Sequence, residues 1–446
     1  MKKIIPIFLL LVSFVFYNCS EKKEQISISK LELKMNKIAT EYVRLALEIG
    51  MFDKNFIDAY YGPDSLKPQS KDLIFSRTVF EHLDKRTNSL LDELESLSDF
   101  PANELERLRY NFLYKQLLAC KTKIYLLNGM NLTFDEELKS LYDIEIEYKD
   151  EKYFDSELAK LDNLLPGKGS IYERYISFRD KFQIPESKVQ EIFEFAIKEC
   201  RRRTNEFIKL PPNERFELKL VKGQPWSAYN WFKGNSFSLI EINTDLPIYV
   251  ERVVDLAAHE GYPGHHVHHT MMEWNLYKKR NWIEFSVYLL FSPQSVIAEG
   301  IASYAPEILF TEDERIQFEK EFIFPLAGLD TSQVVLYFEV MSIINKLNYS
   351  LNNAAKNYLD GNWNEKRTID WIKKYNLRTE DSAKKFLDFI KTYRSYVVNY
   401  SAGYDLIKYI IEEENSKSDR WKVLNQIISS PLLPSTLERI SDVSKN

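Results

Sequence analysis

The sequence predicts a mainly α-helical protein with a substantial core and a small β element beside a metal-binding helix. Hydrophobic residues make up 44% of the 446 residues and charged residues 28%, which is ordinary for a globular protein. Apolar residues recur at helical spacing over most of the chain, and no internal repeat or low-complexity linker interrupts them. Five of the six histidines fall in one run, residues 259–269. Imidazoles crowded around a carboxylate are how proteins hold a divalent metal ion, so a metal site is the leading interpretation.

The first 18 residues predict a signal peptide that is removed on export. Two lysines precede an apolar run, residues 4–17, which has the length of a secretory signal and is short for a membrane-spanning helix. Cys19 follows, and the site resembles that of a bacterial lipoprotein, although residues 16–18 are larger than the small residues usual there. We therefore expect Cys19 to be acylated and residues 19–30 to form a polar tether. The protein would then be anchored to a membrane of the bacterial cell envelope, facing the periplasm or the cell exterior.

The net charge limits which partners we expect, and the cysteines indicate whether the protein contains a disulfide. Loss of residues 1–18 removes two lysines and no acid, so the formal net charge changes from −6 to −8. Such a surface does not attract nucleic acid, and we expect no nucleic-acid partner. Cys120 and Cys200 both lie on apolar helical stripes, which predicts buried free thiols. A disulfide between them in an oxidising compartment stays open as the alternative.

Helical patterns predict an N-terminal helical part over residues 31–210. Asn103 and Glu106 have the spacing of a capping box for a helix that runs to residue 129, and a second helix is expected over residues 187–209. The pair Pro211-Pro212 marks the boundary with a metal-binding catalytic part, residues 211–446. We expect these parts to be two lobes of one large helical unit.

A short strand is predicted just before the histidine run. Residues 236–243 are rich in β-forming residues and are flanked by glycine and proline. A strand beside a metal helix can bind an extended peptide by backbone pairing, and the alternative is a core or edge strand without that role. A helix is then expected to begin at Pro247, with a cap among residues 243–245, and to carry His259 near its end.

The histidine run departs from the zinc-protease motif HExxH. It begins with His259 and Glu260, but Pro263 stands where the second histidine of that motif would be. Proline inside a helix costs about 3 kcal/mol or more, so the helix should bulge or break at this Pro-Gly step. On an ideal helix His266 points the same way as His259 but lies about 10 Å along the axis. The break makes His265 the nearer candidate, and we take it as the second ligand with His266 as the alternative.

The third ligand must come from elsewhere, because a catalytic zinc takes three protein ligands and leaves one position for water. Glu299 is the best candidate, since it lies among small and apolar residues and buried carboxylates are costly unless paired or bound to metal. A structural hydrogen bond to a buried group is the alternative. Asp255, one turn before His259, either orients a ligand imidazole or is a solvated residue. His268 and His269 are expected to form a solvated helix end or an auxiliary polar patch.

The chain resembles the bacterial domain-of-unknown-function 885 family, whose motif is HExxPGHH, in DLAAHEGYPGHHV at residues 255–267 and in AEGIASYA and FPLAGLD after it. Supporting likenesses are YVRLALEIGMFDKNFIDAYYGP near the start and YRSYVVNYSAGYDL near the end, so the resemblance runs from about residue 34 to the C-terminus. The family is allied by its motif to the gluzincin metallopeptidases. The resemblance implies a helical metallopeptidase-like fold, zinc as the cofactor, His259, His265 and Glu299 as zinc ligands, and Glu260 as the general base. It implies a mechanism and no particular substrate.

Two residues late in the chain complete the candidate site. A hydrolase that acts on an amide needs a donor for the developing oxyanion, and Tyr400 is our candidate for it. Arg394 is the candidate binder of a substrate carboxylate. The sequence thus predicts a lipid-anchored zinc hydrolase with a peptide or amide substrate, and a peptidase is the first choice. A metal-dependent amidohydrolase of a non-peptide amide and a non-catalytic binding lipoprotein are the alternatives; the intact Glu260 argues against the second of these. The oligomeric state is not predicted.

The anchor can be tested at Cys19. Cys19→Ala should release the protein from the membrane fraction or leave its signal uncleaved, because acyl chains rather than a spanning helix hold it there. Metabolic labelling with a fatty acid, followed by detergent-phase partition, measures this. Labelling that is unchanged in the variant would contradict acylation at Cys19.

Overall fold

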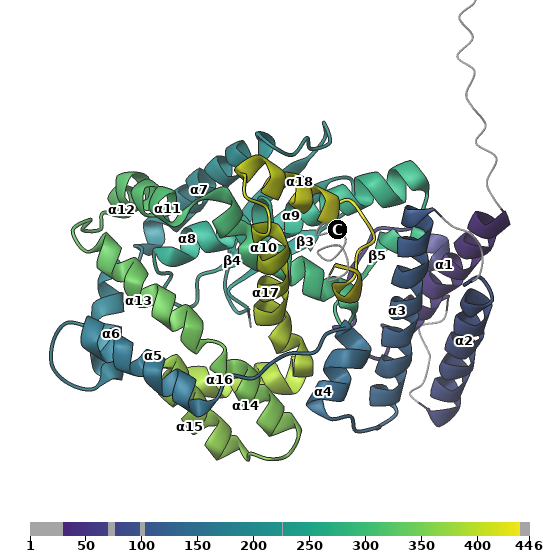
Figure 1. Ribbon diagram of the computed structural model, residues 1–446, viewed down its shortest axis with the longest axis horizontal. Helices are drawn as coiled ribbons and strands as arrows, with labels where there is room; N and C mark the ends of the chain where they lie inside the picture. Colours follow the sequence, from purple (N-terminus) through teal and green to yellow (C-terminus); the bar gives the residue numbers. More distant parts are fainter. Residues whose placement is uncertain (1–29, 70–75, 99–102, 225, 438–446) are drawn as a thin grey trace, which may run out of the picture.

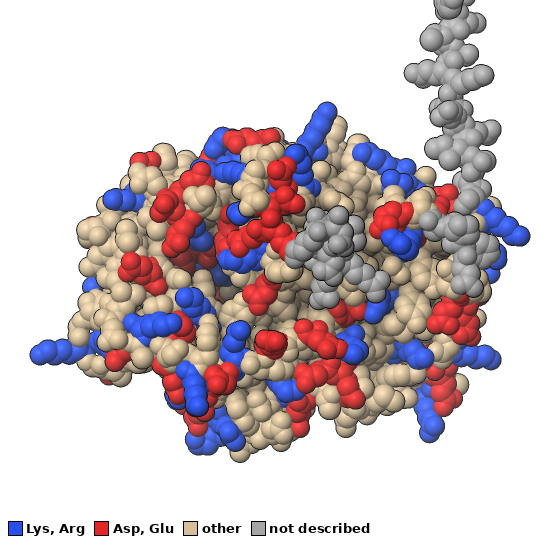
Figure 2. Space-filling view, in the orientation of Figure 1, with Lys and Arg blue, Asp and Glu red and all other residues tan. Residues whose placement is uncertain are grey.

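The computed structural model describes residues 30–69, 76–98, 103–224 and 226–437. The predicted signal peptide, the acylation site Cys19 and the tether lie outside these residues, except that Lys30 begins the first helix. Among the described helices, none is both long and apolar enough to cross a membrane. On the face drawn in Figure 2, acidic and basic side chains are interspersed.

The fold is mainly helical, as the sequence predicts, with two small sheets (Figure 1). The helices are α1 (Lys30–Ile49), α2 (Arg77–Glu95), α3 (Glu104–Leu127), α4 (Phe134–Glu137), α5 (Glu151–Leu164), α6 (Ile171–Arg179), α7 (Val189–Asn205), α8 (Glu251–Leu256), α9 (His265–Met272), α10 (Pro293–Leu309), α11 (Glu312–Phe318), α12 (Phe324–Ala327), α13 (Val334–Leu347), α14 (Ser350–Leu359), α15 (Glu365–Asn376), α16 (Glu380–Tyr393), α17 (Asn399–Glu412) and α18 (Lys417–Ile427). The strands are β1 (Ile57–Tyr60), β2 (Arg215–Val221), β3 (Ala228–Phe232), β4 (Phe237–Asn243) and β5 (Val287–Leu289).

Local sequence rules account for the long N-terminal helices. Helix α3 begins with the expected capping box, in which the Asn103 side chain accepts from the Glu106 backbone N–H and the Glu106 side chain accepts from the Asn103 N–H.

Cys120 on α3 and Cys200 on α7 are both buried and both free. They lie in different hydrophobic clusters, so the alternative of a disulfide between them does not hold.

Two hydrophobic cores meet at helix α10. One core joins α1–α3 to β5 and to the turn before α17, on the right in Figure 1. The other contains α5, α7, α8, α13 and α18. Val296 of α10 belongs to the first core, and Ile297 and Ile301 belong to the second. Almost every residue of α10 is therefore buried, and this helix fixes the two cores relative to each other. The division at residue 210 stays a prediction.

The predicted strand at residues 236–243 is β4, and it is the central strand of its sheet. It pairs parallel with β2 and antiparallel with β3, from Phe237 opposite Arg215 to Asn243 opposite Val221. Because both of its edges are used, β4 cannot add an extended peptide, so the core alternative holds for it. In the described chain the two edge strands of this sheet are β2 and β3.

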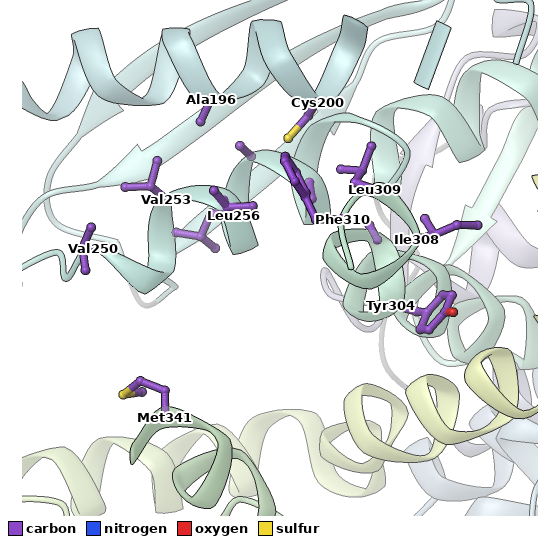
Figure 3. Packing of buried hydrophobic residues seen from close by; sticks show 14 of the residues in the cluster. Ala196, Cys200, Val250, Val253, Leu256, Tyr304, Ile308, Leu309, Phe310 and Met341 are labelled. Atoms are coloured by element: carbon purple, nitrogen blue, oxygen red, sulfur yellow. The ribbon is translucent and has the colours of Figure 1, made fainter. Parts of the chain in front are cut away.

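The helix that carries His259 begins later than predicted. Helix α8 starts at Glu251 rather than at Pro247, and the residue before it makes no side-chain cap. The expected caps bind the neighbouring loops instead; for example, the Asp245 carboxylate accepts from the Gly223 N–H at 2.6 Å. Apolar side chains of α8, among them Val253 and Leu256, face α7 and α10 in the larger core (Figure 3). Core packing, rather than a side-chain cap, therefore stabilises the start of α8.

Helices α10 and α17 cross at two glycines. A Cβ atom on Gly300 would lie 2.4 Å from the Gly403 carbonyl oxygen, and one on Gly403 would lie 2.4 Å from the Val296 carbonyl oxygen. The two backbones therefore approach more closely than any side chain would allow. At the same crossing the Asn399 side chain donates to the Ser295 hydroxyl at 2.8 Å.

We expect Gly403→Ala to lower the free energy of unfolding by about 1–3 kcal/mol, because the added methyl group must push α10 and α17 apart. Thermal unfolding followed by circular dichroism measures this. Gly261→Ala is the matched control, since a Cβ there would meet nothing closer than 3.9 Å. Equal stability of Gly403→Ala and the control would contradict the close crossing.

Candidate metal centre

The Pro-Gly step breaks the helix of the histidine run as predicted. After α8 the chain makes a π-helical turn, Ala257–Gly261, leaves the helix at residues 262–264 and starts α9 at His265. The Gly264 N–H donates to the Ala258 carbonyl at 3.0 Å. A Cβ on Gly264 would lie 1.9 Å from the His259 carbonyl oxygen, so no other residue fits here. The chain is thereby folded back on itself, and His265 comes beside His259.

Three side chains converge at this point: His259 from the π-helical turn after α8, His265 from the start of α9, and Glu299 from α10. The imidazole rings of His259 and His265 are perpendicular, with centroids 4.8 Å apart. Glu299, from α10, reaches between them: its Oε2 lies 3.5 Å from His259 Nε2 and its Oε1 lies 3.6 Å from His265 Nε2. One ligand atom from each of the three residues lies within 4.8 Å of the others. The structure therefore brings together the three residues that the sequence singles out.

The geometry fits a metal ion better than it fits a hydrogen-bonded cluster. Ligand atoms about 2.1 Å from a tetrahedral ion stand about 3.4 Å from one another, close to the separations between Glu299 and the two imidazoles. Those separations are long for hydrogen bonds. Within the described chain, Glu299 Oε2 and His265 Nδ1 are buried without a hydrogen-bond partner. Buried polar atoms are rarely left in this state, so the group has the character of a metal-binding site.

The charges of the group point the same way. Burial alone would lower the pKa of His265, but the carboxylates of Glu299, Glu260 and Asp58 together outweigh burial and raise it to about 9. Burial alone would raise the pKa of Glu299, but the two imidazoles hold it well below its usual range. The cluster thus stabilises positive charge between its members, and a divalent cation would satisfy the same field.

His266, the alternative ligand, points into the core. Its Nδ1 lies 2.7 Å from the Ser238 hydroxyl and its Nε2 lies 2.8 Å from Glu214 Oε1. Glu214 also pairs with Arg201 at 2.6 Å and accepts from the Tyr262 hydroxyl. His266 is completely buried and its two ring nitrogens are both used, so it ties the motif to the sheet.

The expectation of a solvated helix end at His268 and His269 is wrong. The two side chains are 1% and 5% exposed. Burial lowers the pKa of His268 to about 3 and that of His269 well below its usual range, so both imidazoles are neutral at pH 7. The His269 ring packs edge-on against Tyr288 of β5 at 4.8 Å. These residues behave as core side chains because α9 runs inward from His265.

Asp255 does not contact an imidazole. Its carboxylate pairs with Arg315 at 2.7 Å, and the Asp255 side chain is 30% exposed. Arg315 also donates to Glu319 and to the Glu251 carbonyl. Asp255 therefore ties α8 to α11 and does not orient a ligand.

The sequence reasoning missed Tyr396, which holds Glu299 in place. The Tyr396 hydroxyl donates to Glu299 Oε1 at 2.5 Å. The turn that carries Tyr396 is held by the buried Glu137, which accepts from Arg394 Nε and from the Ser395 hydroxyl, both at 2.7 Å. The Arg394 guanidinium is thus engaged by a carboxylate of the protein itself. Its role as a substrate binder stays a prediction, and a substrate would have to share it with Glu137.

Tyr400 lies one turn further along, over the ring of His259. The two rings are nearly parallel, with centroids 6.4 Å apart, and Tyr400 is 40% exposed. Part of the Tyr400 side chain is therefore open to solvent beside the three-residue group. The assigned role of Tyr400 stays a prediction.

Glu260 and three residues that the sequence did not single out complete the surroundings of the metal group. The Glu260 side chain is buried, and its backbone carbonyl accepts from the Asn230 side chain of β3 at 2.6 Å. Its carboxylate acts electrostatically on His265 and on Asp58 of β1. Asp58 accepts from the Tyr229 hydroxyl, and burial raises its pKa to about 6. The only sequence signal for Asp58 was its place in the N-terminal stretch that supports the family resemblance.

A separate cavity of about 630 Å³ lies beyond the ends of β1 and β3, with Tyr61, Lys233 and Glu273 in its lining. None of the three residues of the metal group lines it. The metal group and this cavity are therefore distinct features.

No family model matches the chain, and no curated protein matches its sequence. Two solved structures, each of a protein called a "putative lipoprotein", resemble the fold. The one from Colwellia psychrerythraea has a TM-score of 0.53 and 13% identity, and the match covers 82% of this chain and 69% of that one. The one from Shewanella oneidensis, of unknown function, has a TM-score of 0.45 and 12% identity over 82% of this chain and 73% of that one. The first similarity shows a shared fold.

Metal analysis separates the two candidate histidines. His265→Ala should lose bound metal, because it removes one of the three converging side chains, whereas His266→Ala should retain metal and unfold at a lower temperature, because Glu214 is left buried with one partner fewer. Elemental analysis after loading with zinc, together with thermal unfolding, gives both readouts. The reverse pattern of metal loss would show that His266 is the ligand.

Proposed function

We propose that this protein is a zinc metallopeptidase of the bacterial cell envelope, held to a membrane through a lipid on Cys19. The convergence of His259, His265 and Glu299 beside Glu260 is the single observation that carries the proposal. Its motif resembles that of the domain-of-unknown-function 885 family. The name of the structural neighbour from Colwellia psychrerythraea, a "putative lipoprotein", supports the lipid anchor.

The donor set favours catalysis over a purely structural metal site. Structural zinc sites in proteins have four protein ligands, whereas catalytic sites have three and leave one position open. His259, His265 and Glu299 offer three ligands, and Tyr400, whose ring lies over that of His259, is partly exposed. A divalent metal ion held there would lower the pKa of a water molecule and polarise the scissile carbonyl.

Each remaining residue has a defined task in this proposal. Glu260 takes the proton from the attacking water and delivers it to the leaving amine, as general base and then general acid. The Tyr400 hydroxyl donates a hydrogen bond to the oxygen that becomes negative in the transition state. Tyr396 orients the Glu299 carboxylate through its 2.5 Å hydrogen bond. Arg394 binds a substrate carboxylate, and its guanidinium keeps its contact with Glu137.

Strand β3 favours a peptide as the substrate. It is an edge strand of the described sheet, and its Asn230 binds the backbone of Glu260 directly. An edge strand can pair with an extended peptide through backbone hydrogen bonds. A peptide paired with β3 would pass beside the general base. In this proposal β3, rather than β4 (residues 236–243), pairs with the peptide backbone.

Substitution of the general base separates catalysis from binding. Glu260→Gln keeps the size of the side chain but cannot accept the proton, so hydrolysis of a peptide library should fall by a factor of at least about 100. Zinc content should stay near one per chain, because the three ligands are intact. Elemental analysis and mass spectrometry of the digest measure the two quantities.

Glu299→Ala is the companion variant and should lose both metal and activity. Full activity of Glu260→Gln on a substrate that the wild-type protein cleaves would overturn the proposed role of Glu260. A wild-type protein that still contains no zinc after loading would overturn the zinc centre itself.

A further inference from the structure

Three arginines, Arg179, Arg252 and Arg378, lie near the start of α8. Arg378, which follows α15, lies within electrostatic range of Arg179 and Arg252. Arg179 is paired with Glu251 at 2.8 Å, and the other oxygen of Glu251 accepts from the Tyr337 hydroxyl. That carboxylate is therefore fully used.

The other two guanidinium groups have no acidic partner among the described residues. In the described part of the chain, the side chains of Arg252 and Arg378 form neither a hydrogen bond nor an ion pair with a protein group. The Arg378 guanidinium instead lies over the Phe386 ring, 4.9 Å from its centroid, and both arginines are only partly exposed. Burial, and then repulsion by Arg179, lowers the pKa of Arg378 to about 10, so it is still charged at pH 7. Partly buried cations are costly unless an anion meets them.

Arg252 lies on the same side of its helix as the metal-group residue His259. Along residues 251–261 the residues that are not fully buried are Arg252, Asp255 and His259. Their spacing of three and four residues places them on one side of the helix. Seven residues separate Arg252 from His259, which corresponds to about 10 Å along the axis. Since Asp255 is neutralised by Arg315, the charge that remains at the far end of this face is positive.

A row of neighbouring aromatic rings, none of them on α8, also runs from Arg378 to His259. It begins at the ring under Arg378 and ends at the ring over His259, with centroid separations of 4.7 to 6.4 Å between neighbours. Its members are Phe386, Phe389, Tyr393, Tyr396 and Tyr400, of which all but Tyr396 are partly or well exposed. Partly exposed aromatic rings in a row offer apolar contact to an extended ligand.

We propose that Arg378 and Arg252 bind a carboxylate of the substrate, about three or four residues from the bond that is cleaved. An extended peptide rises about 3.3 Å per residue, so the axial distance of about 10 Å between Arg252 and His259 corresponds to that number of residues. A guanidinium binds a carboxylate through two parallel hydrogen bonds, which the protein's own side chains do not occupy at these two residues. The inference deepens the proposed peptidase function and rests on it for the position of the cleaved bond.

Binding measured without turnover tests this inference. The Glu260→Gln protein, loaded with zinc, is titrated by calorimetry with three forms of one hexapeptide: a free C-terminus, a C-terminal amide, and the amide with one internal glutamate. At least one of the two acidic forms should bind about tenfold more tightly than the neutral amide, and Arg378→Ala should abolish that preference. Preference for the free C-terminus identifies a terminal carboxylate, and preference for the glutamate form identifies an acidic side chain.

Two further variants make the result specific. Arg252→Ala should reduce the same preference, which gives a second measurement if Arg378→Ala folds poorly. Arg367→Ala is the matched control, because Arg367 also lies over an aromatic ring, 4.9 Å from the centroid of Trp363, but is exposed and away from the cluster. It should leave all three affinities unchanged. Equal binding of the acidic and neutral peptides, or an acid preference that survives both arginine variants, would overturn the inference. Acid-selective binding by a protein that cleaves nothing would overturn only the peptidase assignment.

Discussion

The contact between Gly264 and the carbonyl of His259 is the constraint on which the metal centre depends. The chain can fold back so tightly only because Gly264 has no side chain, and its N–H is then satisfied by the Ala258 carbonyl. This turn brings the imidazole of His265 beside that of His259 and sends His266 into the core. A regular helix would have placed the histidines on different sides or about 10 Å apart.

A second close approach brings the third side chain. Gly300 and Gly403 let α10 and α17 cross backbone against backbone, and the turn just before α17 then places Tyr396 on Glu299. Helix α10 also lies between the two hydrophobic cores, so its position is set by packing on both sides. The carboxylate is therefore held by tertiary structure, which is what a metal ligand in a catalytic site requires.

The arginines around the metal group differ in whether an acidic side chain of the protein binds them. Arg315 is occupied by Asp255 and Glu319, and Arg394 by Glu137. Such pairs stabilise the fold, and a ligand at Arg394 would have to share the guanidinium with Glu137. Arg252 and Arg378 differ because no acid of the described chain meets them, and this difference marks the surface where an anion is missing.

The sequence by itself determined the helical class, the capping box at Asn103 and the break at Pro263, because each follows from local spacing or backbone chemistry. It also singled out His259, His265 and Glu299, although it left His266 open as the alternative to His265. It did not determine which residues support them. Tyr396 and Asp58 lie about a hundred or more residues from their partners along the chain, and no local pattern marks them. The same holds for the burial of His268 and His269 and for the central place of β4, since a strand or helix end has the same residue pattern whether or not another element covers it. Only the packing of the two cores around α10 decided those features.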